Sequence, residues 1–406
     1  MAVGLKTPEN LLPVKGVRLG VAQAGIRYAD RDDLVLVELA EGTQTAAVFT
    51  RNAFCAAPVI VSQQHLLTVS PFFLVINSGN ANAGLGEAGM QAARDTCQAV
   101  AELAGCDPEH VLVFSTGVIG EPFATDKLVA ALPAAQGNLS EDNWLHAAHA
   151  IMTTDTVAKG VSEQLMLDGQ TVTVTGMVKG AGMIRPDMAT MLAYIGTDAN
   201  VDASILDDIL SSAVKNSFNR ITVDGDTSTN DACVLMASGQ AGNRVISDPL
   251  SDEAGLLAAS IERVCQQLAE AMLRDAEGAT RLMTIIVEQG EDEDECAKVG
   301  FTIAHSPLVK TALFAGDPNW GRILAAIGRS GVDDLDIDRI EIMLDDVCIV
   351  SNGGRAGSYT EEAGQRVMQQ DVVTVTVRLG RGEASSTVKT CDFSYDYVRI
   401  NAEYRS

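Results

Sequence analysis

The sequence lacks any apolar run that approaches the ~20 residues of a membrane-spanning helix, so we expect no membrane partner. Its first fifteen residues contain no basic segment followed by an apolar one, which argues against a signal peptide. Lys and Arg together number 29, against 54 Asp and Glu, and the formal net charge is −25. Because a chain this acidic repels phosphate backbones, we also expect no nucleic acid partner.

Paired cysteine motifs are missing as well. None of the eight cysteines forms a C-x-x-C, and none has a nearby histidine at metal-ligand spacing. We interpret them as reduced, mostly buried thiols of a cytoplasmic protein and expect no metal. His146 and His149 are interpreted as helix surface or core, since no acidic third ligand accompanies them. The run Glu291–Glu295 is interpreted as a solvated loop or helix start.

The sequence motifs of common hydrolases and nucleotide-dependent enzymes are missing too. There is no G-x-S-x-G nucleophile elbow. Gly180-Ala-Gly182 resembles the start of a dinucleotide-binding loop, but Arg185 stands where the third glycine belongs. The segment Gly316–Gly321 lacks the Lys-Ser/Thr ending of a phosphate-binding loop. These templates therefore do not account for the chain.

What is present is enough apolar material for a folded protein: 47% of the 406 residues are hydrophobic. Strand-like and helix-like segments are interspersed throughout, which predicts a mixed α/β fold. No internal repeat is evident, and no linker clearly divides the chain. Strands are expected at residues 34–39, 46–49, 72–76, 111–114, 171–178, 190–195, 283–287, 340–344 and 372–379, and helices at 87–104, 204–218 and 253–274.

An unusual segment, Lys179–Leu192, places two glycines and Pro186 just ahead of a strand that begins with Thr190. By itself this pattern also fits a tight structural hairpin. The functional interpretation is that the Thr190 hydroxyl attacks the carbonyl carbon of Ala189, so that the acyl group moves from nitrogen to oxygen before water hydrolyses the ester. The freed α-amine, with a pKa near ~7.7–8.0, then acts as the base for its own hydroxyl, and no histidine is needed.

A second segment supports this interpretation. The stretch Val113–Gly120 follows an expected strand and turns at Gly117. The Gly117 N–H and the Thr116 hydroxyl would stabilise an oxyanion if they pointed at one spot. Alone, the motif is weak, and an ordinary strand-end turn explains it equally well.

Taken together, these segments give a resemblance that extends over essentially the whole chain. The chain resembles glutamate N-acetyltransferases of the ornithine acetyltransferase family, which cleave themselves. The matching segments are Phe49–Asn52, Asn77–Ala83, Ser115–Gly120, Met152–Thr156, Lys179–Leu192, Thr222–Asp231, Gly316–Arg322 and Ile400–Ser406.

The resemblance implies an α/β fold, a layered α-β-β-α sandwich with helices outside two packed sheets. It also implies cleavage between Ala189 and Thr190 into an alpha chain, residues 1–189, and a beta chain, residues 190–406. The implied reaction is ping-pong transfer of acetyl from N-acetylornithine to glutamate through acetyl-Thr190, without a cofactor. Some members also use acetyl-CoA, and we expect both activities here. Two chains of each kind would form a heterotetramer.

The resemblance also implies the site residues. Thr190 is the nucleophile, and Thr116 with Gly117 forms the oxyanion hole. The implied substrate contacts are Thr153, Lys179, Thr190, Glu277, Asn401 and Ser406. Lys179 and the Thr153 hydroxyl suit an amino-acid carboxylate, whereas Glu277 suits an ammonium group.

Two other functions compete with this one. A self-cleaving amide hydrolase or aminopeptidase of related architecture would release the acyl group to water, and sequence alone separates it poorly from a transferase because exclusion of water decides the outcome. A non-catalytic acidic scaffold would use the glycine-rich turn only structurally and would remain one uncut chain.

Overall fold

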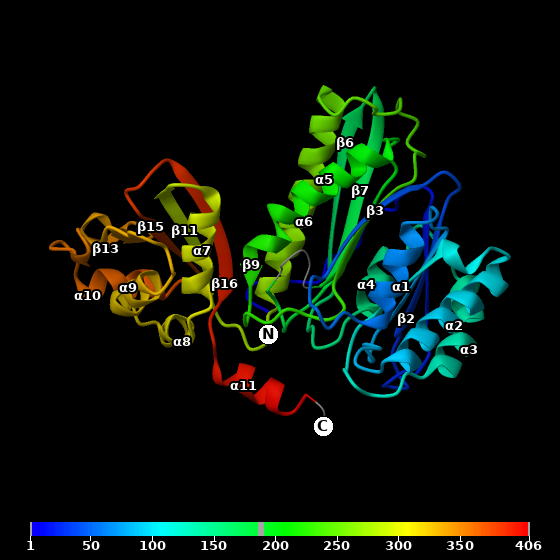
Figure 1. Ribbon diagram of the computed structural model, residues 1–406, viewed down its shortest axis with the longest axis horizontal. Helices are drawn as coiled ribbons and strands as arrows, with labels where there is room; N and C mark the ends of the chain where they lie inside the picture. The colour runs from blue at the N-terminus through cyan, green and yellow to red at the C-terminus, as the bar shows by residue number, and fades with distance from the viewer. Residues whose placement is uncertain (1, 186–190, 405–406) are drawn as a thin grey trace. The chain divides into compact units, whose positions relative to one another are not determined.

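The fold is described from a computed structural model, which covers residues 2–185 and 191–404 here (Figure 1). The chain forms two compact units. The larger unit comprises Lys6–Asn219 and Asp226–Met272, and the smaller one comprises Met1–Leu5, Arg220–Gly225 and Leu273–Ser406. Each unit is described by itself.

The larger unit contains a four-stranded sheet in the order β1-β2-β4-β5. Its strands are β1 (Val17–Ala22), β2 (Leu34–Leu39), β4 (Phe73–Asn77) and β5 (Val111–Ser115). β4 and β5 run parallel, and every residue in both is buried. This explains why their sequences read as continuous apolar runs and do not alternate, as expected for strands that are covered on both faces.

A five-stranded sheet, in the order β3-β10-β8-β7-β6, forms the second layer of strands in the larger unit. Its strands are β3 (Gln44–Phe49), β6 (Lys159–Leu167), β7 (Gln170–Lys179), β8 (Leu192–Thr197) and β10 (Ala232–Ala237). β7 pairs antiparallel with β8, and β8 pairs parallel with β10. The strand expected at 190–195 is present but shifted: it spans Leu192–Thr197, and Met191, which is also described, lies before it.

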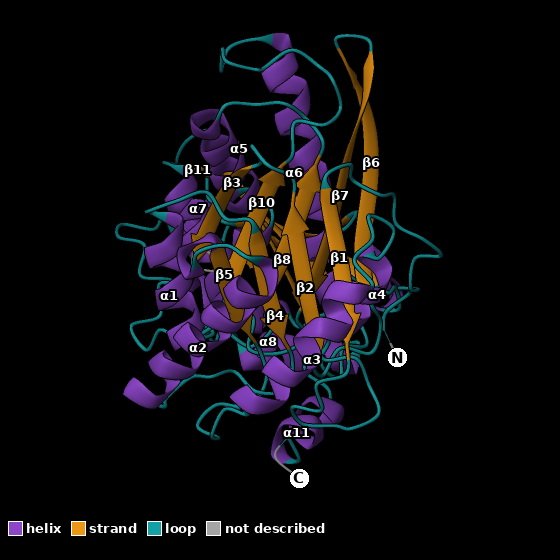
Figure 2. Ribbon diagram, turned by 90° about the vertical axis from the view of Figure 1, so that its right-hand side faces the viewer, coloured by secondary structure: helices purple, strands orange, loops and turns teal. Residues whose placement is uncertain are grey.

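The two sheets pack face to face, and helices cover their outer faces. Leu74, Ile76 and Phe114 of the first sheet share one core with Met177 and Tyr194 of the second. The helices α1 (Ala57–Leu66), α2 (Glu87–Ala104) and α3 (Thr125–Gly137) cover the four-stranded sheet, and Figure 2 looks onto this covered face. The five-stranded sheet carries α5 (Ala203–Lys215) and α6 (Asp252–Arg274), and α4 (Trp144–Ala150) lies at the sheet-to-sheet core. The predicted α-β-β-α layering is confirmed.

The helix α2 shows how local sequence sets an element. It spans Glu87–Ala104, as predicted, and its buried side includes Ala93, Cys97 and Ala101. It ends at Gly105, which has a φ of 75° and whose N–H donates to the Ala101 carbonyl. Glycine suits this left-handed end because it has no Cβ to collide with the preceding turn.

The smaller unit is built on a seven-stranded sheet in the order β14-β13-β12-β15-β11-β16-β9. The strands are β9 (Ile221–Thr222), β11 (Leu282–Gly290), β12 (Glu341–Leu344), β13 (Val347–Ser351), β14 (Gly354–Arg355), β15 (Val372–Arg378) and β16 (Ala384–Cys391). The helices are α7 (Glu293–Ala304), α8 (Pro307–Ala315), α9 (Trp320–Gly328), α10 (Glu361–Met368) and α11 (Tyr395–Ala402). Side chains of α7–α10 and of this sheet form a core of their own.

Within residues 2–185 and 191–404, no helix is both long and apolar enough to span a bilayer.

Candidate active site

The loops that follow β4 and β5 form the first part of the site. Asn77 and Ser115 end these parallel strands side by side, and the Ser115 hydroxyl donates to Asn77 Oδ1 at 2.6 Å. The next residue, Thr116, donates its N–H to the Asn77 carbonyl at 3.0 Å. Asn80 forms isolated β-bridge pairings with both Thr116 and Val118. The carboxyl ends of parallel strands are where α/β sheets commonly present ligand-binding loops.

Gly117 is crowded against the neighbouring loop. Its φ of 133° lies in the region that favours glycine, and a Cβ built there would stand 2.3 Å from the carbonyl carbon of Gly79. No side chain fits so close to another backbone, so the two loops lie together only because position 117 carries none. The predicted turn at Gly117 is therefore confirmed as a required feature of the fold.

Lys179 is the residue by which the five-stranded sheet contributes to the site. It is the last residue of β7, and its Nζ donates to Thr116 Oγ1 at 3.2 Å. The Thr116 side chain is largely buried, and Lys179 is half-buried. One predicted substrate contact and one predicted oxyanion donor are thus in direct contact.

Asp155 links Thr153 to the backbone next to Lys179. The Thr153 N–H donates to Asp155 Oδ2 at 3.0 Å, and the N–H of Gly180, next to Lys179, donates to Oδ1 at 2.8 Å. Lys159 Nζ is 2.6 Å from the same Oδ1, and neither side chain of this ion pair is exposed. Thr116, Gly117, Thr153 and Lys179 are therefore gathered in the larger unit.

The predicted nucleophile and the predicted cleavage bond lie outside the described residues. These are Thr190 and Ala189, together with the predicted substrate contact Ser406. Lys179 and Leu192, which flank the segment 180–191 in sequence, are paired across β7 and β8. The Met191 carbonyl accepts from the N–H of Ala232 at 2.9 Å, so the chain enters β8 at the sheet edge where Lys179 ends β7.

Glu277 and Asn401 lie in the smaller unit, where they contact each other. Asn401 Nδ2 donates to Glu277 Oε2 at 2.8 Å, and Glu277 is buried whereas Asn401 is exposed. The helix α11, which carries Asn401, is tied to the Glu277 loop because the Ser394 hydroxyl that caps it donates to the Gly278 carbonyl at 2.6 Å. Of the three residues of this unit predicted to meet substrate, the two whose placement is described thus form one polar group.

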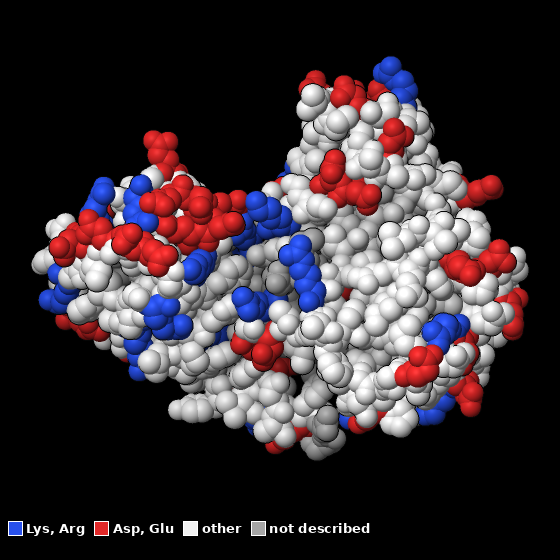
Figure 3. Space-filling model, in the orientation of Figure 1, with Lys and Arg blue, Asp and Glu red and all other residues white. Residues whose placement is uncertain are grey.

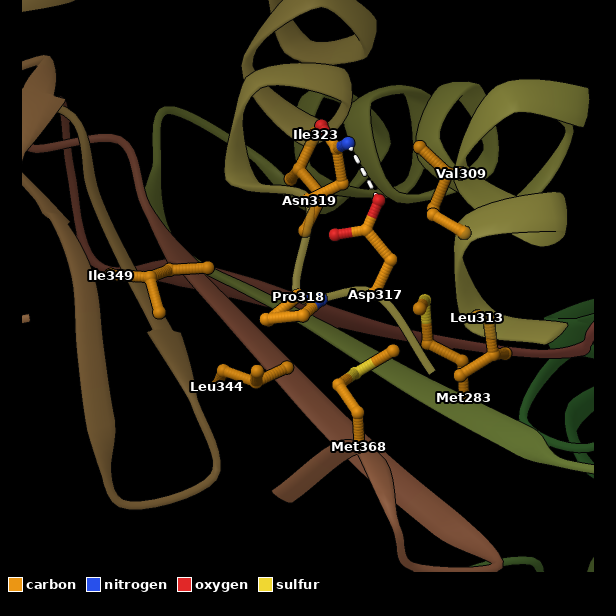
Figure 4. Close-up of a pocket in the computed structure, with 11 residues that line it drawn as sticks. Met283, Val309, Leu313, Asp317, Pro318, Asn319, Ile323, Leu344, Ile349 and Met368 are labelled. Atoms are coloured by element: carbon orange, nitrogen blue, oxygen red, sulfur yellow. Dashed lines mark hydrogen bonds between the residues drawn. The ribbon is translucent and has the colours of Figure 1, made fainter. Parts of the chain in front are cut away.

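A pocket elsewhere in the smaller unit is distinct from these residues. It encloses about 280 Å³, including space open to solvent, and it is lined by apolar side chains with a single carboxylate, that of Asp317. Figure 4 shows Asn319 Nδ2 donating to this carboxylate, at 2.9 Å. None of the predicted site residues lines the pocket, so it does not contribute to the candidate site.

The features interpreted as structural keep that interpretation. His146 and His149 are exposed on α4. All eight cysteines are free, and most are buried. No cluster of three or more His, Cys, Asp or Glu within the described parts of the chain is arranged to hold a metal.

The acidic run begins a helix. Asp292 caps α7 by accepting from the N–H of Glu295 at 2.7 Å. Carboxylates are favourable at a helix N-terminus, where the free amide groups carry partial positive charge. Arg381 also pairs with Glu291 and Glu295, at 3.0 and 3.2 Å. Figure 3 shows how Asp and Glu gather on the visible face of the smaller unit with Lys and Arg among them.

Comparison with known proteins decides the family, because the ArgJ family model matches residues 18–406. The chain belongs to the ArgJ family. It is 53% identical to the arginine biosynthesis bifunctional protein ArgJ of Pseudomonas syringae pv. tomato and 52% identical to that of Pseudomonas fluorescens, in alignments that cover 100% of both chains. The crystal structure of arginine biosynthesis bifunctional protein ArgJ from Bacillus halodurans is 39% identical with a TM-score of 0.50, covering 52% of this chain and 98% of that chain. The resemblance inferred from the motifs is confirmed.

Two residues of this ArgJ-family chain that sequence reasoning did not single out lie beside the candidate site. Asn230 Nδ2 donates to the carbonyls of Ala81 and Ser115, at 2.6 and 2.9 Å, and so holds the loop before β10 against the loops that follow β4 and β5. Asp231 is buried, and its Oδ2 has no hydrogen-bond partner among the described residues. Burial raises the pKa of Asp231 well above its usual range, although the Ser228 hydroxyl and the charge of Lys179 act in the opposite direction.

Proposed function

We propose that this chain transfers an acetyl group from N-acetylornithine to glutamate through an acetyl ester on Thr190, giving ornithine and N-acetylglutamate in arginine biosynthesis. Membership of the ArgJ family and relatives named as arginine biosynthesis proteins support the pathway. The single structural observation that carries the proposal is the contact of Lys179 Nζ with Thr116 Oγ1 at the sheet edge where the chain enters β8.

The nucleophile is generated by self-cleavage. The Thr190 Oγ attacks the carbonyl carbon of Ala189; the C–N bond of that peptide breaks, and the proton lost by the hydroxyl is gained by the nitrogen. Water then hydrolyses the ester, which leaves the Ala189 carboxylate and a Thr190 that carries a free amine and hydroxyl. A neutral α-amine, with a pKa of about 7.7–8.0, suits a general base near neutral pH.

Acetyl transfer follows in two half-reactions. The amine takes the proton of the Thr190 hydroxyl as Oγ attacks the acetyl carbonyl of N-acetylornithine, and ornithine leaves with that proton. The amine of glutamate then attacks the acetyl ester and regenerates the hydroxyl. In each step the negative oxygen is stabilised by the Thr116 hydroxyl and the Gly117 N–H, and such donors are worth several kcal/mol because they are already in place.

Substrate recognition uses charges of both signs. Lys179 and the Thr153 hydroxyl bind the carboxylate that N-acetylornithine and glutamate share, while Glu277 binds the ammonium group. Asn401, which contacts Glu277, and the chain-terminal residue Ser406 complete the proposed contacts. The reaction needs no cofactor, since both half-reactions use only hydroxyl, amine and oxyanion donors.

Cleavage would divide the molecule into residues 1–189 and 190–406, which we propose assemble as two alpha and two beta chains. The solved chain from the Bacillus halodurans relative supports a two-chain molecule, because it is covered over 98% of its length by only 52% of this chain. The eight free cysteines support a cytoplasmic location, because thiols stay reduced there.

The decisive experiment measures ornithine release from N-acetylornithine with and without glutamate. A transferase should release ornithine continuously only when glutamate is present, and N-acetylglutamate should form in equal amount. Equal release in both reactions would favour the competing amide hydrolase.

Use of acetyl-CoA as a second acetyl donor is proposed because the relatives are named bifunctional. Thiol release from acetyl-CoA should then depend on glutamate and should disappear in Thr190→Ala if both donors share one nucleophile. Thiol release that persists in that variant would place the second activity elsewhere.

Replacement of Lys179 by methionine should raise KM for N-acetylornithine about 10- to 100-fold, because a hydrogen bond to a charged group contributes about 1.5–3 kcal/mol. Initial rates over a range of substrate concentrations measure this. Lys127→Met is the matched control, since Lys127 is an exposed lysine of α3 whose Nζ donates to the Gly25 carbonyl. Equal KM values for the two variants would remove Lys179 from the substrate site.

A further inference from the structure

Asp155 is a buried carboxylate to which no step of the proposed reaction assigns a role. It lies in the loop between α4 and β6, in the segment Met152–Thr156. Its side chain has no exposed surface and accepts from two backbone N–H groups and one ammonium group. The two amides come from different parts of the larger unit, because Gly180 follows Asp155 by 25 residues.

Each amide belongs to a segment that the proposed function uses. The Thr153 N–H bonds to Oδ2 at 3.0 Å, and the Thr153 hydroxyl is a proposed carboxylate ligand. The Gly180 N–H bonds to Oδ1 at 2.8 Å, and Gly180 both follows Lys179 and lies, in sequence, at the start of the segment that carries the proposed cleavage bond. One carboxylate therefore accepts from the backbone beside two proposed substrate contacts, Thr153 and Lys179, and from the described beginning of the proposed self-cleavage segment.

Two lysines favour the ionised form of Asp155. Burial alone would raise the pKa of Asp155, but the charges of Lys159 and Lys179 and the hydrogen bonds from Lys159 and Thr153 outweigh it, so the pKa falls below its usual range. Asp155 thus stays ionised near neutral pH. Its charge also attracts the Lys179 ammonium, whose Nζ reaches Thr116 Oγ1 at 3.2 Å.

Fold stability alone is a poor explanation for such a pair. Removing two charges from water costs several kcal/mol each, and a well-packed apolar pair of similar volume is often as stable or more stable. What an apolar pair cannot do is accept hydrogen bonds from Thr153 and Gly180. The buried carboxylate therefore serves to fix the positions of those two amide groups.

We propose that Asp155 is a positioning residue that holds Thr153 and the backbone that follows Lys179 in one arrangement, so that both substrate binding and the self-cleavage that begins beyond Gly180 depend on it. This inference rests on the proposed function. Attack by a hydroxyl requires reacting atoms about 3–3.5 Å apart, and a displacement near 1 Å costs about 10²-fold in rate. Loss of the Gly180 anchor should therefore slow self-cleavage, and loss of the Thr153 anchor should weaken substrate binding.

The test compares two variants of the full chain with wild type. Asp155→Asn retains the shape of the side chain but has a single acceptor oxygen. It can therefore keep a good hydrogen bond from at most one of the two backbone N–H groups, those of Thr153 and Gly180. The double variant Asp155→Leu with Lys159→Met replaces the ion pair by apolar side chains and leaves no buried charge without a partner. Conversion to the two fragments is followed on denaturing gels over time. KM and kcat for N-acetylornithine are then measured per cleaved molecule, counted by the acetyl label that Thr190 takes up.

Asp198→Asn is the matched control. Asp198 is also buried, and its Oδ1 accepts from the Thr173 N–H at 2.7 Å, but this contact lies at the other end of β7. Six residues of strand, or about 20 Å, separate Thr173 from Lys179. Asp198→Asn should therefore cleave and bind as wild type does, apart from any change in thermal stability.

We expect both Asp155 variants to cleave about 10²-fold more slowly and to show a KM about 10-fold higher. The double variant should remain folded by circular dichroism but unfold at a lower temperature, because the Thr153 and Gly180 N–H groups lose their acceptor. A double variant that cleaves and binds as wild type would overturn the inference, and so would equal defects in Asp198→Asn. A wild-type chain that cleaves but shows no glutamate-dependent ornithine release would contradict the proposed function instead, and the cleavage rates would still test Asp155.

Discussion

Thr190→Ala is expected to yield a single uncut polypeptide of 42.8 kDa and to lose acetyl transfer by about 10⁴-fold or more. The reason is that one hydroxyl serves both reactions. Without it the Ala189 carbonyl meets no nucleophile, so the α-amine that should act as base is never released, and no side chain at position 190 takes up acetyl. Mass spectrometry of the purified chain and the rate of ornithine release measure the two losses.

Thr190→Ser is the control for this prediction, because it keeps a hydroxyl and removes only a methyl group. It should cleave and transfer acetyl, at reduced rates, since the methyl group restricts the rotation of the threonine side chain. Two fragments in the Thr190→Ala preparation would reject Thr190 as the cleaving nucleophile. Acetyl label on another residue of the wild-type chain would reject it for transfer.

Gly117→Ala is the second change with a large expected effect. The new Cβ would stand 2.3 Å from the Gly79 carbonyl carbon, and a φ of 133° is strained for alanine. The loops after β4 and β5 must then separate, which moves the Gly117 N–H and the Thr116 hydroxyl away from the oxyanion. We expect kcat to fall about 10²- to 10³-fold, the loss typical of a missing oxyanion donor. Turnover of fully cleaved protein measures it.

Gly137→Ala separates this effect from a general intolerance of glycine substitution. Gly137 ends α3, and a Cβ there would meet no atom within 4 Å. It should retain wild-type activity. A Gly117→Ala variant with normal kcat would show that the loop can relax and that Gly117 does not supply a critical donor.

Much of the fold could be predicted where local pattern and burial agree. The helix Glu87–Ala104 was predicted with both ends, because a small-residue stripe and Gly105 mark it unambiguously. The strand β6 (Lys159–Leu167) was missed, because it lies at the edge of its sheet, half-exposed, and its polar residues hide the strand pattern. Edge strands are defined by their neighbours more than by their own sequence.

The residues of the candidate site also differ in whether the sequence alone could indicate them. Thr116 and Gly117 are adjacent in sequence, so a local motif could indicate them. Asp155 could not be predicted as an anchor, because its role depends on Gly180, which only the pairing of β6, β7 and β8 brings near. Asn230 likewise acts on Ser115, 115 residues away. A single sequence gives residue types, whereas such partners follow from the assembled sheets.

The order of strands in the five-stranded sheet has a consequence for how the mature protein comes into being. β3, β6 and β7 precede the proposed cleavage bond, and β8 and β10 follow it. The sheet alternates strands from the two sides of that bond, with six residue pairs joining β7 to β8 and six joining β10 to β3. Neither product could build this layer alone. We therefore expect the proposed scission to follow folding, so that only a molecule that has already assembled this sheet acquires the reactive N-terminus.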